Sequence, residues 1–157
     1  MDVYRIGELA AGSGALVHVP ILGQCLCAGF PPPADDFREG ALELPRWLAP
    51  NPPATFAWNI SGNSMRAAGI FDRDLAVVDR SLKAGHGSVV VAAIDGEMSI
   101  KRLVIDGNVA RLAFDNSDLP AFAVEELSDG EIWGVVRFSI RWHIARARLV
   151  RSAAPSR

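Results

Sequence analysis

From Thr55 onward, the chain alternates short runs rich in Val, Ile and Phe with residues typical of turns. Runs of this length and composition, bounded by turn residues, are typical of β-strands. The chain from Thr55 onward is therefore predicted to be mainly β-structure. The runs that fit this description are TFAWNI, LAVVDR, SVVVAAI, MSIKRLVI, VARLAF, AFAVEEL and IWGVVRFSIRWHI.

Two glycine-containing turns connect three of these runs. Asp95-Gly96 separates SVVVAAI from EMSIKRLVI, and Asp106-Gly107-Asn108 precedes VARLAF. Such residues adopt positive φ at little steric cost, so they are typical of β-hairpins. The sequence therefore predicts a three-strand meander in this part of the chain. Several short strands with little helix indicate an antiparallel sheet, curled into a sandwich or a partly closed barrel.

Proline is concentrated ahead of this region. Seven of the ten prolines lie within residues 29–53, where they fix backbone dihedrals and disfavour regular sheet pairing. Residues 1 to about 53 are therefore predicted to form an extended N-terminal arm, with residues 29–53 as a Pro-rich extended segment and LELPRWLA as one short helical turn. A β domain is expected over residues 54–144. A disordered tail is expected over residues 145–157, which contain mostly Ala, Ser and Arg.

The composition limits the possible functions. A chain of 157 residues with 50% hydrophobic and 22% charged residues has the size and composition of one globular domain. Asp and Glu outnumber Lys and Arg by 18 to 16, whereas a domain that binds DNA by itself needs a basic stripe to neutralise phosphates. No direct sequence-specific DNA binding is therefore expected. No stretch approaches the roughly 20 apolar residues of a membrane span, so no membrane association is expected.

Cys25 and Cys27 are the only cysteines, and they stand in QCLCAGFPPP. Two cysteines cannot complete a four-ligand zinc site, and a disulfide between residues i and i+2 is sterically poor. We therefore expect no metal and no other cofactor. The apolar segment before these residues is similar to a secretion signal, but Asp2 and Glu8 replace the usual positive start. Two free thiols fit a reducing compartment, and a cytoplasmic location is predicted.

Ser64 is a candidate nucleophile. It follows Gly62-Asn63 and precedes Met65 in SGNSMRAAGI, so its hydroxyl is expected at a bend beside backbone N–H groups. Such a bend can stabilise an oxyanion, and Gly62, Asn63 and Met65 are the residues expected to support it. A turn serine that hydrogen-bonds to its own backbone fits the same pattern. The nucleophilic role requires a neighbouring base, because a serine hydroxyl must lose its proton as it attacks.

Lys101 is the candidate base. In MSIKRLVI, the period of two places Lys101 on one face with Leu103 and Ile105, and Arg102 on the other. A lysine on an apolar face loses hydration, which lowers its pKa toward the range in which it accepts a proton. From the residues alone, a lysine at a sheet edge whose amine reaches water is the interpretation that the pattern favours. The three histidines stand in no motif that indicates a Ser/His/Asp triad.

Several separated motifs resemble one known family. They are AG at 28–29, FPPPADDF, SGNSM, GIFDRDLAVVD, GSVVVAAIDGEMSIKRL, DNS at 115–117 and WGVVRF. In these motifs the chain resembles the LexA-type self-cleaving serine peptidases, and among them the UmuD/MucA proteins of SOS mutagenesis. The intervals agree with that family as well, with 35 residues from Gly29 to Ser64 and 37 from Ser64 to Lys101.

The resemblance implies a reaction and partners. Ser64 would be the nucleophile and Lys101 the general base, and the substrate would be the chain's own peptide bond between Ala28 and Gly29. This cleavage would remove residues 1–28. The family also implies a RecA filament on single-stranded DNA as activator, a homodimer of the shortened product, and a UmuC-like Y-family DNA polymerase as partner in translesion synthesis. It implies no cofactor.

Two other functions fit parts of the sequence. One is a non-enzymatic β-fold binding module in which Ser64 and Lys101 are structural, and the other is a LexA-like peptidase that acts on another protein.

The chain differs from some members of the family at the cleavage position. It carries Ala-Gly there, as some members do, whereas other members carry Cys-Gly. The 28 residues before Gly29 show no two-helix pattern, so a DNA-binding repressor is not expected.

Overall fold

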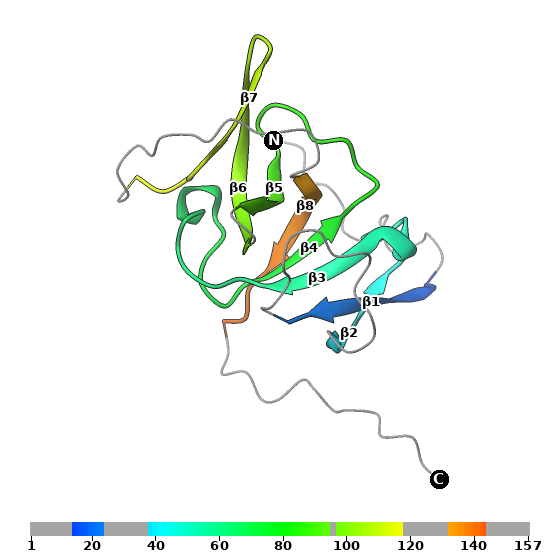
Figure 1. Cartoon of the computed structure of the whole chain (residues 1–157). Helices are drawn as coiled ribbons and strands as arrows, with labels where there is room; N and C mark the ends of the chain where they lie inside the picture. Colours follow the sequence, from blue (N-terminus) through cyan, green and yellow to red (C-terminus); the bar gives the residue numbers. More distant parts are fainter. Residues whose placement is uncertain (1–13, 24–37, 95–96, 118–131, 144–157) are drawn as a thin grey trace, which may run out of the picture.

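The computed structural model describes residues 14–23, 38–94, 97–117 and 132–143 (Figure 1). Within these residues the regular structure is strands and two short 3₁₀ segments, so the predicted mainly β chain is confirmed. The expected strand AFAVEEL and the expected tail lie outside the described residues. The elements are β1 (Leu16–Leu22), β2 (Arg38–Pro45), η2 (Pro52–Ala54), β3 (Thr55–Asn59), η3 (Arg66–Ala68), β4 (Leu75–Asp79), β5 (Val89–Ile94), β6 (Glu97–Asp106), β7 (Val109–Ala113) and β8 (Ile132–Ile140).

The strands form one open sheet in the order β2-β1-β3-β4-β8-β5-β6-β7. Neighbouring strands are antiparallel, except that β1 and β3 are parallel. Figure 1 shows β5, β6 and β7 standing at one end of the sheet and β1, β2 and β3 lying across the other, with β4 and β8 between them. The predicted LexA/UmuD-type curled sheet is confirmed, with one parallel pair and no closure into a barrel.

The predicted meander is present as β5, β6 and β7. β5 pairs with β6, and β6 pairs with β7, both antiparallel. Gly107 lies in the turn between β6 and β7 with φ of +59°, a left-handed conformation that glycine adopts without strain. This register places Lys101 in the middle of β6, opposite the buried Val90 of β5.

The N-terminal region differs from the prediction. Two stretches that were expected to belong to an unpaired arm form β1 and β2, which pair from Leu16 opposite Pro45 to Leu22 opposite Arg38. The LELP half of the predicted helical turn is the end of β2. The expectation that proline prevents pairing here was wrong, because β2 is an edge strand and β1 contacts β3 only near its end. Proline is tolerated where the ladder is incomplete on one side.

β4 carries the centre of the hydrophobic core. All of its residues are buried, and the four apolar ones alternate between two apolar clusters. Leu75 and Val77 belong to one cluster with residues of β1 and β3, whereas Ala76 and Val78 belong to the other. A strand covered on both faces needs a continuous apolar run, which explains the LAVV sequence. The second cluster lies beneath the loop between β3 and β4 and consists of Trp58, Ile60, Met65, Ile70, Ala76, Val78 and Val91.

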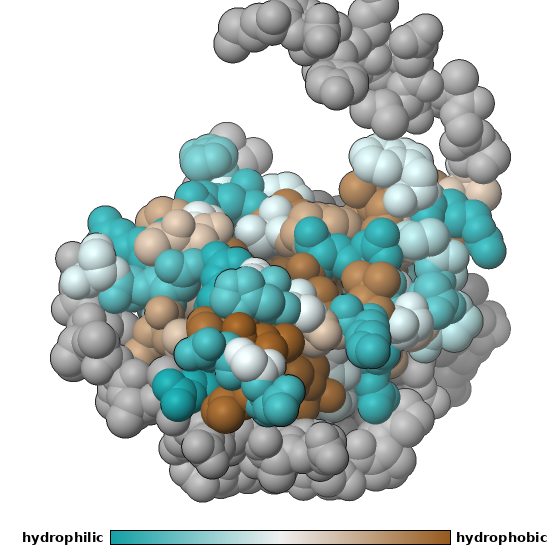
Figure 2. Space-filling view, turned by 90° about the horizontal axis from the view of Figure 1, so that it is seen from above, coloured by the Kyte–Doolittle hydropathy of each residue, from teal (hydrophilic) through white to brown (hydrophobic). Residues whose placement is uncertain are grey.

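The surface mixes polar and apolar residues. Figure 2, seen from above the view of Figure 1, shows hydrophobic residues in small groups among hydrophilic ones. In the part of the chain that the structure describes, no helix is long and apolar enough to cross a membrane. Among the described residues, the large hydrophobic side chains that remain exposed are Leu16, Trp47, Leu82, Ile105 and Trp142.

Gly134 in β8 provides a test of the packing between β4 and β8. A Cβ added there would lie 2.7 Å from Cγ1 of the buried Val78, which is closer than van der Waals contact allows. Gly134→Ala is therefore expected to lower the free energy of unfolding by about 1–3 kcal/mol, the usual cost of overpacking. Denaturant unfolding measures the change. Gly85→Ala is the control, because an added Cβ at Gly85 meets no atom within 4 Å; equal losses in both variants would contradict the argument.

Candidate active site

Ser64 lies in the loop of residues 60–74, which connects β3 to β4. The next residue, Met65, is 1% exposed and packs in the cluster beneath the loop. The Met65 carbonyl accepts hydrogen bonds from the N–H groups of Ala68 at 3.1 Å and Ile70 at 3.2 Å. A buried side chain and two backbone bonds thus fix the chain immediately after Ser64, while Ser64 itself remains half-buried.

The bend before Ser64 depends on Gly62 and Asn63. Gly62 has φ of +91°, which favours glycine, and its N–H donates to Oδ1 of Asp72 at 2.9 Å. The Asn63 carbonyl accepts the N–H of Arg66 at 3.3 Å and so begins the turn that contains Ser64. Gly62 therefore supports the turn, and in this conformation its N–H is bound to Asp72 instead of facing an oxyanion.

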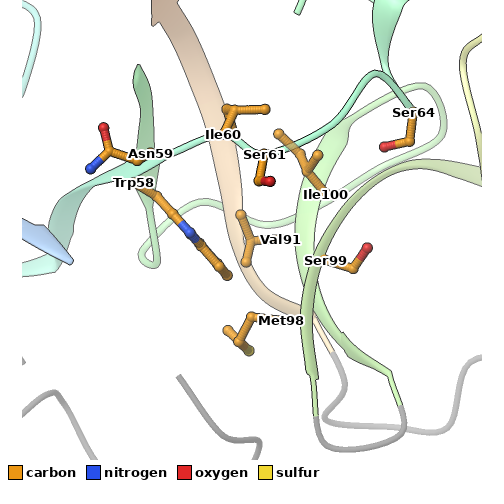
Figure 3. Close-up of a pocket in the computed structure, with 9 residues that line it drawn as sticks. All are labelled: Trp58, Asn59, Ile60, Ser61, Ser64, Val91, Met98, Ser99 and Ile100. Carbon is orange, nitrogen blue, oxygen red and sulfur yellow. The ribbon is translucent and has the colours of Figure 1, made fainter. Parts of the chain in front are cut away.

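Ser64 opens onto a pocket of about 220 Å³ between the loop and β6 (Figure 3). In Figure 3, Ser64 and Ser99 lie toward one end of the pocket and Trp58 toward the other. The remaining wall is mostly apolar, so the pocket offers hydroxyl groups beside a surface suited to a small apolar side chain. The lining residues are Trp58, Asn59, Ile60, Ser61, Ser64, Val91, Met98, Ser99 and Ile100.

Lys101 contacts the pocket through Ser99. Its Nζ donates a hydrogen bond to Oγ of Ser99 and another to the carbonyl oxygen of Ile100 at 3.2 Å. The same Nζ lies 4.8 Å from the centre of the Phe114 ring. Lys101 is half-buried. The apolar face of β6 that was predicted around Lys101 is present only in part, because Leu103 is buried whereas Ile105 is exposed.

A short segment after β7 joins the Ser64 loop to the meander. The N–H of Asp115 donates to the Ser64 carbonyl at 2.9 Å, and the N–H of Ala67 donates to the Asp115 carbonyl at 2.7 Å. The side-chain amide of Asn116 donates to the Asn63 carbonyl at 2.7 Å. These three bonds span the loop on both sides of Ser64. The nucleophile candidate is thus held by a segment that directly follows β7.

The other end of the loop is fixed by Arg141, just beyond β8. Its Nε donates to Oδ1 of Asp74 at 2.9 Å, and its Nη2 donates to Oδ2 of Asp74 at 2.7 Å and to the Gly69 carbonyl at 2.6 Å. The guanidinium also lies 3.7 Å from the centre of the Phe71 ring. The bonds from Arg141 hold the pKa of the buried Asp74 below its usual value, with a further contribution from the N–H of Phe71, although burial opposes the shift.

Residues 20–137 match the family model for Peptidase S24-like proteins. The chain belongs to this peptidase family. It is 37% identical to protein MucA of Escherichia coli over 135 residues, which cover 85% of this chain and 92% of MucA. It is 41% identical to protein ImpA of Shigella flexneri over 134 residues, covering 85% and 90%. It is 32% identical to the LexA repressor of Clostridium perfringens over 134 residues, covering 85% and 66%. The resemblance to UmuD/MucA-like and LexA-type proteins is confirmed.

For this S24-like chain, the structure brings only part of the predicted site together. Ser64 lines the pocket, and Lys101 reaches it by its bond to Ser99. Both roles stay predictions, as do the oxyanion roles at the bend. The predicted cleavage pair, Ala28 and Gly29, lies outside the described residues, as do the two cysteines.

Sequence reasoning missed two residues of this site. Ser99 could have been found, because a spacing of two in a strand places it on the same face as Lys101. Asp115 stands in the DNS motif at 115–117, but that motif assigned it no role in the site. Its role comes from backbone contacts with a loop far away in the sequence, which no local pattern reveals.

Asp74 makes the stability of this loop depend on pH. The folded pKa of Asp74 is lowered, so its stabilising effect is fully present above the unfolded value of about 3.9 and is lost as the pH falls through the folded pKa. Asp74→Asn is expected to lower the free energy of unfolding by about 1–3 kcal/mol at pH 7 and to weaken the acid dependence of Tm. Thermal unfolding between neutral and acidic pH measures both effects.

Asp106→Asn serves as the control for this prediction, because Asp106 is an exposed carboxylate at the end of β6. This variant should keep the stability and the acid dependence of the original protein. An Asp74→Asn protein with unchanged acid dependence would show that the ion pair does not stabilise the fold.

Proposed function

We propose that this chain is a self-cleaving serine peptidase in which Ser64 is the nucleophile, Lys101 is the general base and the substrate is its own Ala28-Gly29 bond. The observation that carries the proposal is the pocket between the Ser64 loop and β6, with Ser64 on its wall and the Lys101 amine bonded to Ser99 on the same wall. Membership in the S24-like peptidase family supports it.

The reaction follows from the chemistry of these groups. Lys101 in its neutral form takes the proton from Ser64 Oγ, which attacks the carbonyl carbon of Ala28. Backbone N–H groups at the Ser64 bend stabilise the resulting oxyanion. The intermediate then collapses, the C–N bond breaks, and the amine of Gly29 leaves with the proton from Lys101. Water, deprotonated by Lys101, hydrolyses the ester and frees Ser64.

The biological setting is proposed from the family. The trigger is a RecA filament on single-stranded DNA during the SOS response, and the product is a homodimer that acts as accessory subunit of a UmuC-like Y-family polymerase in translesion synthesis. The similarity to MucA and ImpA supports this branch of the family. The net charge of −2 fits a protein whose partners contact the DNA. Action in the cytoplasm, without a membrane, belongs to the same proposal.

Mass spectrometry of the purified protein, with and without a RecA filament on single-stranded DNA, tests the reaction. The expected product is a fragment that begins at Gly29, formed faster with the filament. Ser64→Ala and Lys101→Met should each slow its formation by about 10³-fold or more, because removing either group of a catalytic pair disables the other. Both variants should keep the thermal unfolding behaviour of a folded protein.

Lys83→Met is the matched control, since Lys83 is the other lysine of the chain and lies exposed in the loop between β4 and β5. It should cleave at the original rate. Absence of the fragment in the unmodified protein under either condition would favour the non-enzymatic binding module. Cleavage of an unrelated protein, with residues 1–157 left intact, would favour a LexA-like peptidase that acts on another protein.

The rate of cleavage without RecA should increase with pH. Only the neutral amine of Lys101 can accept the proton of Ser64, and the unperturbed pKa of lysine is about 10. Below the pKa of the base, the neutral fraction and therefore the rate rise by about tenfold per pH unit. Rates measured from pH 7 to pH 10, within the range where the protein remains folded, test this. A rate independent of pH would contradict the assignment of Lys101 as the general base.

A further inference from the structure

Arg102, the residue after Lys101, points to the opposite face of β6 and contacts the segment that holds Ser64. Its Nε and Nη2 both donate to Oδ2 of Asp115, the first at 3.1 Å. Its Nη1 donates to the carbonyl of Gly87 at 2.7 Å. The guanidinium therefore uses three of its nitrogens in fixed directions, which a lysine cannot reproduce.

Asp115 connects this ion pair to the nucleophile. Its carboxylate accepts from Arg102, while its own N–H donates to the Ser64 carbonyl and its carbonyl accepts from Ala67. The covalent neighbour of Arg102 is Lys101. One continuous series of contacts therefore joins the strand position of the candidate base to the loop position of the candidate nucleophile.

We propose that the Arg102–Asp115 ion pair positions Ser64 relative to Lys101 and so sets the rate of self-cleavage. The inference rests on the proposed function. Neither residue touches the substrate in this proposal, and both are positioning residues. The pair fixes the separation of two parts of the site that belong to different segments, the loop between β3 and β4 and the middle of β6.

The solvent exposure of the pair separates this role from a purely stabilising one. The side chains are 30% and 29% exposed, and an ion pair that is partly exposed contributes little to the free energy of unfolding. Catalysis is far more sensitive to geometry, because a displacement of about 1 Å can reduce a rate by about 10²-fold. Loss of the pair should therefore affect cleavage much more than stability.

A double-mutant cycle on the full chain tests the proposal, with Arg102→Ala, Asp115→Ala and the double variant. Each single variant should cleave about 10- to 100-fold more slowly than the original protein at pH 7 and at pH 10. The double variant should be no slower than the slower single variant, because the same interaction is lost in all three. Arg102→Lys should recover part of the rate, since it keeps one charged donor.

The pH profile distinguishes positioning from an effect on the base. A positioning defect lowers the rate by the same factor at every pH, whereas a change in the titration of Lys101 moves the midpoint of the profile. Asp79→Asn is the stability control. It removes one partner of the Arg137–Asp79 pair between β8 and β4, so it should lower Tm without slowing cleavage by the folded protein.

The outcomes separate this inference from the proposed function. If the original protein yields no fragment from Gly29, the proposed function fails and the inference fails with it. If the original protein is cleaved but the Arg102 and Asp115 variants match its rate, or their effects simply add, the positioning role is overturned. A loss of rate that follows the loss of Tm, as seen also in Asp79→Asn, would likewise overturn it.

Discussion

The complete burial of β4 is the constraint on which the rest of the structure depends. Its apolar residues alternate between two apolar clusters, so the strand needs cover on both faces. β3 and β8 pair on either side of it and connect the N-terminal strands to the meander. The Ser64 loop runs directly into β4, and Asp74 at its end is buried. A fully buried strand therefore defines where the loop ends.

With little helix in the described residues, the loops of this sheet are fixed by polar contacts. Three arginines pair with carboxylates on other segments of the chain; two of these pairs hold loop residues and the third joins β8 to β4. Two of the three carboxylates are buried. Burial of a carboxylate is costly unless charged donors satisfy it, and arginine can offer two donors at once. Burial alone would raise the pKa of Asp79, but bonds from Ser81 and Arg137 outweigh it and leave that pKa lowered. The pairs are Arg141–Asp74, Arg137–Asp79 and Arg102–Asp115.

The sequence predicted the parts of this fold that depend on local patterns. Short β-branched runs and the Asp106-Gly107 turn were sufficient for the meander, because alternation and turn chemistry act over a few residues. The pairing of β1 with β2 was missed, since a proline rule for central strands was applied to the edge of the sheet. The tether between Asp115 and Ser64 was missed because it joins backbone groups distant in the sequence. The candidate residues could be found from the sequence, but the long-range contacts that hold them in place could not.

The position of β1 bears on how the chain could present the proposed cleavage bond to Ser64. Leu22, the last residue of β1, pairs with Arg38 of β2 on one side and with Trp58 of β3 on the other. Trp58 lines the pocket, and Met98, another lining residue, packs against the cluster that contains Leu22. Ala28 follows Leu22 by six residues, and six residues of extended chain reach at most about 20 Å. The segment that contains the proposed cleavage bond thus follows a strand that ends beside the pocket, and tethering of this kind would raise the effective concentration of the bond at Ser64. Under the proposed function, a connection this short would permit cleavage within one molecule.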